Sequence, residues 1–521
     1  MSLRTDGETT PGPAGPSQSI DVSLETADAF QHSLRIATGI DVRVADVPVC
    51  PGHQSPWDFL RDVQADRPSL ALVLGARGTG KSYLSALDTH LTSLTRPGHE
   101  TRVLGGSRSQ SEQIYRALRG FARDWRPEMG DDPIRSLLKS EASYGNGSEV
   151  SILAASSTSV RGPHAPSLKL DEVDEIDADH FEAAMGMCME RGGASASVVM
   201  TSTWHRLGGP MSGLIERARA GEFPLYSFCI FEVLESCPES RSGKFLEHCP
   251  RCPLVKHCHD VPPGFSPKAK RSNGHYKIDA LIQKLRTTGA RTFEADYLCK
   301  GPRADGLWFP GFDAESHVRE AAEYDPGQPV HLAIDSGVFT GAVFFQVARD
   351  PTGSGADDRV RVFADYLREG ASAETTAREI LALAQSRCNG RLDRLSTDPA
   401  GGSRNAIGAT VIAEYERVGL RPLARWPTGS VADGLALLES FVQPAEGPPR
   451  LTVHPRCRAT IAALRSYRRA KRGGQWQDYP EDPQHPHEEL VDSLRGGLRT
   501  CYPEGRARPI HFPRIPARQV F

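Results

Sequence analysis

The stretch LALVLGARGTGKS, residues 70–82, decides how the first half of the chain folds. Its apolar run, Leu70–Leu74, predicts a buried strand that passes directly into a glycine-rich turn ending at Lys81 and Ser82. The turn satisfies G-x-x-x-x-G-K-[ST] in the strand-loop-helix context that this motif requires. Backbone N–H groups of such a loop wrap phosphates at the start of a helix. The stretch therefore predicts a nucleotide-binding site.

Positions within the motif assign a role to each residue. Lys81 would reach the β- and γ-phosphates of ATP, and the Ser82 hydroxyl would ligate Mg²⁺. Arg77 either places a guanidinium near the transferred phosphate, as an arginine finger does, or is a solvent-exposed loop arginine. The residues expected to bind ATP with Mg²⁺ are Gly75, Gly78, Thr79, Gly80, Lys81, Ser82 and Asp171.

A second strand with an acidic end follows downstream. In Leu168-Lys169-Leu170-Asp171-Glu172, Asp171 would hold the Mg²⁺ side, and Glu172 is placed to polarise the attacking water. The alternative is that residues 171–177 form a solvated acidic loop. The next strand ends in Thr201-Ser202-Thr203, whose hydroxyls would sense the γ-phosphate or simply cap a helix. Together these patterns predict ATP hydrolysis.

Short apolar runs alternate with helical patterns between Leu70 and Thr201, which indicates an α/β domain with a mostly parallel sheet. From Val330 the order changes. The runs 330–335, 341–347 and 360–365 follow one another with short connections and predict an antiparallel meander. Helix and strand then alternate, and a helix from about His487 to Arg499 ends the second domain.

Three aspartates of this second domain lie at strand ends or on the last helix. Asp335 ends the first strand of the meander, Asp398 ends the strand that follows the meander and a helix, and Asp492 lies on the last helix. In a ribonuclease H-like arrangement, acids at these places hold two divalent ions for phosphodiester hydrolysis. Oxygen ligands favour Mg²⁺ or Mn²⁺. Asp365 is the next candidate ligand, and His487 would support the site or cap the helix.

Composition narrows the class of protein. Lys plus Arg number 62 against 65 for Asp plus Glu in 521 residues, so the net charge of -3 excludes a uniformly basic nucleic-acid binder. The apolar runs are far shorter than the roughly 20 residues that cross a bilayer, and the N-terminus lacks a signal-peptide pattern. We therefore expect a soluble cytoplasmic protein with no membrane contact, in which clustered cysteines indicate metal ligands.

Four of the 11 cysteines have the spacing of a metal site: Cys237, Cys249, Cys252 and Cys258. Four thiolates would hold a structural Zn²⁺, although a 4Fe–4S cluster suits the same spacing and unliganded cysteines are a further alternative. The others show no ligand spacing and are expected to be small buried hydrophobic residues; they are Cys50, Cys188, Cys229, Cys299, Cys388, Cys457 and Cys501.

These patterns divide the chain into six segments. We expect a low-complexity tail at 1–40, a P-loop ATPase domain at 41–215, a Cys-rich metal-binding insertion at 216–275, a bridging linker at 276–325, a ribonuclease H-like nuclease domain at 326–503 and a basic tail at 504–521. A basic stretch near the nuclease, either a DNA contact or a solvated loop, comprises Arg465, Arg468, Arg469, Lys471 and Arg472.

A P-loop ATPase followed by a ribonuclease H-like nuclease resembles the large subunit of tailed-phage terminases. Segments similar to that family are SVRG at 159–162, FEADY at 293–297, GLWFP at 306–310 and DSLR at 492–495. The resemblance covers roughly residues 45 to 500. It assigns ATPase positions to Arg77, Lys81, Ser82, Asp171 and Glu172, and nuclease positions to Asp335, Asp398 and Asp492. Gly496 stands where the family often has Tyr, and HEE at 487–489 replaces a His-Asp-rich approach.

The resemblance implies an ATP-driven motor that translocates viral double-stranded DNA into procapsids, and a two-metal endonuclease that cuts concatemeric DNA. It further implies a portal protein, a terminase small subunit and a homo-oligomeric ring, all in the cytoplasm of an infected bacterial host. The basic C-terminal tail (Arg506, Arg508, Arg514, Arg518) would dock the portal. Two alternatives are a DNA-repair or defence ATPase-nuclease without a capsid partner, and a DNA-binding scaffold with an inactive nuclease.

Overall fold

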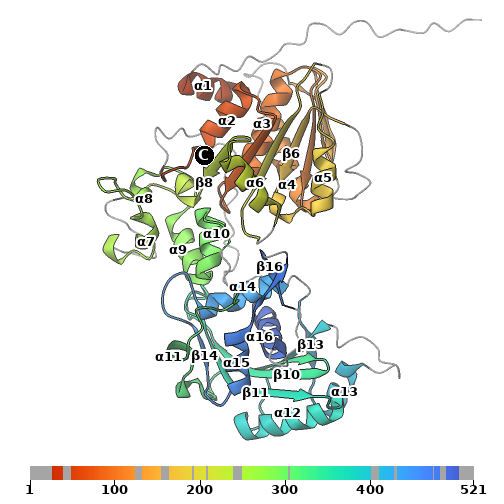
Figure 1. Ribbon diagram of the computed structural model, residues 1–521, viewed down its shortest axis with the longest axis vertical. Helices are drawn as coiled ribbons and strands as arrows, with labels where there is room; N and C mark the ends of the chain where they lie inside the picture. The colour runs from red at the N-terminus through yellow and green to blue at the C-terminus, as the bar shows by residue number, and fades with distance from the viewer. Residues whose placement is uncertain are drawn as a thin grey trace, which may run out of the picture.

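The computed structural model places two α/β domains one above the other along the long axis of the molecule, with the helices α9 and α10 between them (Figure 1). It describes residues 26–38, 49–123, 132–153, 164–190, 193–206, 209–238, 249–302, 306–399, 410–427, 431–472, 475–481 and 488–503. The segment 159–162, His487, residues 1–25 and the basic tail at 504–521 lie outside these ranges.

The first domain is built on an eight-stranded sheet in the order β3-β4-β5-β2-β6-β7-β1-β8. The strands are β1 (Leu70–Gly75), β2 (Glu100–Gly105), β3 (Ile134–Leu137), β4 (Glu141–Tyr144), β5 (Glu149–Ile152), β6 (Ser167–Asp171), β7 (Ser197–Ser202) and β8 (Leu225–Phe228). All neighbours are parallel except the β3-β4-β5 edge, which is antiparallel. The mostly parallel sheet that the sequence predicted is confirmed.

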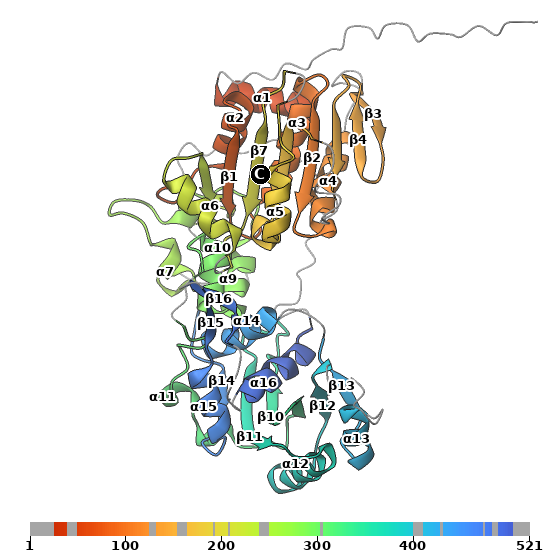
Figure 2. The same ribbon diagram turned by 45° about the vertical axis from the view of Figure 1, so that its right-hand side comes forward.

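Helices cover both faces of this sheet (Figure 2). They are α1 (Ala27–Thr38), α2 (Pro56–Ala65), α3 (Lys81–Thr95), α4 (Arg108–Arg123), α5 (Ala178–Met185) and α6 (Pro210–Arg219), with a short 3₁₀ turn, η2, at Val173–Glu175. Successive residues of β1 point to opposite faces, so Leu72 and Leu74 join one hydrophobic cluster while Ala71 and Val73 join the other. Because β1 is buried on both faces, all its positions favour apolar residues, which explains the continuous apolar run in the sequence.

Helix α1 corrects the expected tail. We expected residues 1–40 to form a low-complexity tail, but residues 27–38 are helical. The reason is a pair of apolar side chains one helical turn apart: Phe30 and Leu34 are both fully buried, and the Phe30 ring lies 4.7 Å from the Trp57 ring of α2. Burial of this one stripe holds the helix on the domain.

The boundary expected at residue 215 also lies further along the chain, because β8 is the edge strand beside β1. After β8 come the short elements η3 (Ile230–Val233), η4 (Cys249–Arg251), α7 (Val255–Cys258) and α8 (Lys268–Arg271), of which α7 and α8 lie at one side of the first domain (Figure 1). Helices α9 (Ile278–Thr287) and α10 (Ala290–Leu298) follow. Leu281 and Phe293 are buried in the same cluster as β1, so the predicted linker packs on the first domain.

The second domain has a six-stranded sheet in the order β13-β12-β9-β10-β11-β14. Its strands are β9 (Val330–Ser336), β10 (Phe339–Ala348), β11 (Arg359–Glu369), β12 (Arg394–Thr397), β13 (Leu423–Arg425) and β14 (Leu451–Val453). The first three form the expected antiparallel meander, and β12 returns parallel to β9. The α/β fold class with a second, mixed sheet is thereby confirmed. Trp308 and Phe309 are buried in the core of this domain, which therefore begins before residue 326.

The remaining elements surround this sheet. They are α11 (Ala314–His317), η5 (Glu320–Ala322), α12 (Ala373–Cys388), α13 (Val411–Val418), α14 (Val431–Val442), α15 (Arg458–Ser466), the hairpin β15 (Arg469–Arg472) and β16 (Gln475–Pro480), and α16 (Glu488–Cys501). Helix α16 packs across β9 and β10. A Cβ atom at Gly341 would lie 2.8 Å from the Glu489 Cβ, so the glycine allows this close approach. No described helix has the length and hydrophobicity needed to cross a membrane.

A buried ion pair joins the first helix after the glycine loop to the strand that carries Asp171. The Lys169 ammonium on β6 donates to Asp88 on α3, and both side chains are almost fully buried. Asp88 also accepts a hydrogen bond of 2.6 Å from the Gln64 side chain. Because each charge depends on the other for compensation, the pair fixes the position of α3 against β6.

We predict that Lys169→Met destabilises the first domain by about 3–5 kcal/mol, because it leaves the Asp88 carboxylate buried without its cation. The double variant Asp88→Leu, Lys169→Met should recover most of that loss, since neither charge remains. Denaturant unfolding of the three proteins measures the difference. A single variant as stable as the double variant would show that the pair does not govern this contact.

Candidate active sites

The glycine loop has the expected strand-loop-helix setting between β1 and α3. Gly78 and Gly80 adopt φ angles of 83° and 81°, a left-handed conformation that suits glycine. Gly75 is constrained by space instead, because a Cβ there would lie 2.5 Å from the Lys81 Cγ. The loop thus folds tightly around the Lys81 side chain.

Lys81 is buried within that loop. Its Nζ donates to the Ala76 carbonyl at 3.3 Å and to the Thr203 hydroxyl at 2.9 Å, and it lies 3.5 Å from the Glu172 carboxylate. The ammonium therefore stands where residues from the ends of three neighbouring strands meet. Carboxyl ends of parallel strands share one edge of a sheet, which is why residues 122 positions apart in sequence touch here.

Asp171 is the buried acid of the site. Its Oδ2 accepts a 2.5 Å hydrogen bond from Ser82, and its Oδ1 accepts one of the same length from Thr201. Burial and then the neighbouring Glu172 charge raise the pKa of Asp171, while these two hydrogen bonds oppose the shift. Hydroxyl and carboxylate oxygens side by side suit a hard divalent cation, so Ser82 and Asp171 fit Mg²⁺.

Glu172 follows directly at the strand end. Its φ of 50° is a left-handed conformation that a non-glycine residue seldom adopts, and such backbone strain is typical of functional positions. The turn aims the carboxylate at Lys81 rather than away from the loop. Of the three predicted sensor hydroxyls, Thr201 contacts Asp171 and Thr203 contacts Lys81, whereas Ser202 accepts the Asp174 N–H.

Arg77 is anchored to helix α10. Its Nε lies 3.0 Å from the Asp296 carboxylate, and its backbone N–H donates to the Asp296 carbonyl at 2.7 Å. The Asp296 charge raises the pKa of Arg77. Sequence reasoning missed this partner, although Asp296 lies in the segment FEADY that carried part of the family resemblance.

The three nuclease candidates gather in the second domain. Burial raises the pKa of Asp335 well above its usual range, and the charges of Asp492, Glu489 and Asp398 add to the shift, so four carboxyl groups crowd together. Glu489 was not predicted from the sequence, although it lies one helical turn before Asp492. Burial, followed by the charges of Asp492 and Asp398, raises the pKa of Glu489 to about 7. Such a crowd of oxygen donors fits divalent cations.

Asp492 is held in place on α16. Its Oδ1 accepts hydrogen bonds from the Tyr467 hydroxyl at 3.2 Å and from Arg495 at 2.5 Å. Asp365 is engaged elsewhere, because it accepts the backbone N–H of Thr460 at 2.9 Å and the hydroxyl of Thr460 at 3.0 Å at the start of α15. The structure therefore groups Asp335, Asp398 and Asp492 and assigns Asp365 a structural contact.

The cysteines form two groups rather than one. Burial raises the pKa of Cys258 to about 11, with the charges of Cys249, Cys252 and Cys237 adding to the effect, so the four predicted cysteines are neighbours. Cys249 Sγ also lies 3.0 Å from His259 Nε2. In the described part of the chain, a further set of ligand atoms lies within 4.8 Å of one another, and it belongs to Cys50, His53, Cys229 and Glu232. Cys50 and Cys229 are buried as expected, but they are not isolated.

The basic stretch contains both buried and exposed residues. Arg469 begins β15, its guanidinium stacks 3.6 Å from the centre of the Trp308 ring, and its Nη1 lies 2.7 Å from Asp478. Lys471 and Arg472, on the same hairpin, are exposed. Arg469 therefore stabilises the hairpin and is withdrawn from the set of candidate DNA contacts.

No family model and no curated protein matches this sequence. Solved structures do match in three dimensions. The large terminase of the thermophilic bacteriophage D6E, in crystal form 2, superposes with a TM-score of 0.58 at 11% identity and covers 87% of this chain and 99% of that chain. Structures of the same terminase with ADP and with ATP-gamma-S give a TM-score of 0.56 at 12% identity, covering 86% and 99%.

The superposition with the first of these structures extends over most of this chain and nearly all of the other. At this level of identity the match establishes architecture. The chain has the two-domain fold of a phage large terminase.

Proposed function

We propose that this chain is the large subunit of a tailed-phage terminase, which hydrolyses ATP to translocate double-stranded DNA into procapsids and cuts concatemeric DNA with a two-metal nuclease. The observation that carries the proposal is the presence of two assembled sites in one terminase fold. Lys81, Asp171 and Glu172 meet in the first domain. Asp335 and its three carboxylate neighbours meet in the second.

The first site supports hydrolysis of ATP. The glycine loop presents backbone N–H groups to the phosphates, and Lys81 supplies the cation beside them. Ser82 and Asp171 would hold Mg²⁺, which neutralises charge on the phosphates when bound. The Glu172 carboxylate would polarise a water molecule, and the left-handed turn at this residue directs the carboxylate toward the loop. Arg77, tied to Asp296, would report the state of the loop to α10.

The second site supports phosphodiester cleavage. Asp335, Asp398 and Asp492 would hold two Mg²⁺ or Mn²⁺ ions, which stabilise the attacking and leaving oxygens. Four carboxyl groups with Arg495 as a neighbouring cation carry excess negative charge, and divalent ions would relieve it. Glu489 is a candidate additional ligand because it shares this environment.

The partners follow from this function: double-stranded DNA, a portal protein on a procapsid, a terminase small subunit and further copies of the chain in a ring, in the host cytoplasm. A DNA-repair or defence ATPase-nuclease would carry the same two sites without a capsid partner. Purified procapsids distinguish the two, because only a packaging motor converts DNA to a nuclease-protected form in their presence. The retained acids in both sites disfavour an inactive scaffold.

We predict that Glu172→Gln lowers ATP turnover by about 10²–10⁴-fold, because the amide cannot accept a proton from water. Lys81→Ala should abolish turnover by removing the phosphate clamp. Glu182→Gln, an exposed position on α5, serves as the control and should leave turnover unchanged. Phosphate release with double-stranded DNA is the measurement, and wild-type turnover by Glu172→Gln would remove this residue from the mechanism.

For the nuclease, Asp335→Asn should reduce cleavage of plasmid DNA in Mg²⁺ or Mn²⁺ by about a hundredfold or more, because the loss of metal ions removes several kcal/mol of transition-state stabilisation. Asp398→Asn and Asp492→Asn should act likewise, and all three should retain ATP turnover. Asp365→Asn is the matched control, since an amide oxygen can still accept from Thr460. If Asp335→Asn cuts normally and Asp365→Asn does not, the site lies at Asp365 within β11 instead.

We also propose that Cys237, Cys249, Cys252 and Cys258 hold a structural Zn²⁺, with a 4Fe–4S cluster as the alternative. The variant Cys249→Ser, Cys252→Ser should lose one metal site per chain, while Cys457→Ser should lose none, because Cys457 is buried in the second domain. Elemental analysis of protein purified without chelator distinguishes zinc from iron. The absence of both metals from the wild-type protein would refute the proposal.

A further inference from the structure

We infer that Cys50, His53, Cys229 and Glu232 form a second, separate Zn²⁺ site that holds the segment before α2 against the end of β8. One ligand atom from each residue lies within 4.8 Å of all the others. Two thiols, one imidazole and one carboxylate are a donor set that zinc accepts in proteins.

Two of the separations are close to the edges of a zinc tetrahedron. The sulfur atoms of Cys50 and Cys229 lie 3.5 Å apart, and His53 Nδ1 lies 3.2 Å from Glu232 Oε1. With Zn–S of about 2.3 Å and Zn–N or Zn–O of about 2.0–2.1 Å, tetrahedral edges are roughly 3.8 Å between sulfurs and roughly 3.3 Å between nitrogen and oxygen. The same sulfur separation is too long for a disulfide, and both cysteines are free.

Three of the four ligand side chains are buried, and His53 is 17% exposed. Cys50 and Cys229 are 5% and 2% exposed, and the Glu232 side chain is 1% exposed. A buried carboxylate beside two thiols is costly unless a cation or hydrogen bonds compensate it. Here the backbone N–H groups of Val49 and Cys50 donate to its two oxygens at 2.8 and 2.9 Å, which orients the carboxylate as outer-shell donors orient metal ligands.

Local backbone geometry brings each pair of ligands together. Gly52, at a φ of 75°, forms the turn of Cys50-Pro-Gly-His53, so the first and fourth residues face the same point. Cys229 caps η3, and Glu232 follows three residues later on the same side of this 3₁₀ turn. In both pairs two residues separate the first ligand from the second. The two pairs are 176 or more residues apart in the sequence, and the contact between the Cys229 N–H and His53 shows that the fold brings them together.

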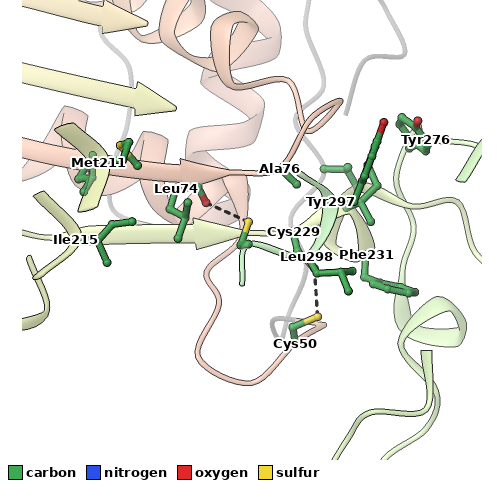
Figure 3. Close-up of a cluster of buried hydrophobic side chains, with 14 of the residues drawn as sticks. Cys50, Leu74, Ala76, Met211, Ile215, Cys229, Phe231, Tyr276, Tyr297 and Leu298 are labelled. Carbon is green, nitrogen blue, oxygen red and sulfur yellow. Dashed lines mark hydrogen bonds between the residues drawn. The ribbon is translucent and has the colours of Figure 1, made fainter. Parts of the chain in front are cut away.

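Four protein ligands leave no open position, so the site is structural. The site lies next to the glycine loop. The Phe228 carbonyl, next to Cys229, accepts the Ala76 N–H of the glycine loop at 3.1 Å, and Figure 3 shows Cys50, Cys229 and Ala76 in one buried cluster. A metal at this point would stiffen the base of the nucleotide-binding loop without entering it.

The test is metal analysis of the full-length protein, purified without chelator, in a Cys249→Ser, Cys252→Ser background that leaves only the inferred site. We expect one zinc per chain, with an X-ray absorption spectrum showing a mixed shell of two sulfurs and two nitrogen or oxygen ligands. Adding Cys50→Ser and Cys229→Ser to this background should remove that zinc. Cys388→Ser, another buried cysteine, should not.

A metal-free background protein, a shell of sulfur alone, or a Cys50–Cys229 disulfide found by mass spectrometry would overturn the inference. The measurement on the background protein stands even if the added variant fails to fold, because it keeps all four ligands intact. None of these readouts depends on ATP hydrolysis or DNA cleavage, so the site is tested independently of the proposed function.

Discussion

The parallel pairing of β6, β7 and β1 is the constraint on which the first domain depends. Three adjacent parallel strands end at one edge, so the glycine loop after β1, the acids after β6 and the hydroxyls after β7 must meet there. The contacts of Asp171 with Ser82 and Thr201 are the direct result. Burial of β1 on both faces keeps these strand ends in register.

The second domain also gathers acidic residues at one point, and their mutual repulsion makes this arrangement costly. Its sheet places Asp335 on β9 beside Asp398 after β12, because these strands are parallel neighbours, and α16 brings Asp492 and Glu489 to the same point. Like charges held near one another oppose folding. The hydrogen bond from Ser493 to the Gly341 carbonyl, at 2.9 Å, and the close approach permitted by Gly341 hold α16 in place against that repulsion.

The two domains meet near the glycine loop. A cleft of about 200 Å³ between them is lined by Arg77 and His205 from the first domain, by Asp296 of α10, and by Glu439 and Arg469 from the second. The pairing of Arg77 with Asp296 therefore links the loop to the helix that borders the second domain. Charged residues of both signs line this junction together with apolar ones such as Trp308.

Local sequence determined the parts whose signals lie within one element: the loop at 75–82, the strand end at Asp171 and Glu172, the meander from Val330 and the acids at 335, 398 and 492. Hydrophobic period and turn residues carry that information along the chain. Tertiary structure alone decided the partner of Arg77, the addition of Glu489 to the acids and the meeting of Cys50 with Cys229. In each of these cases the residues have no recognisable spacing or lie far apart in the sequence. Burial and sheet order bring them together, and local propensity carries no signal of the contact.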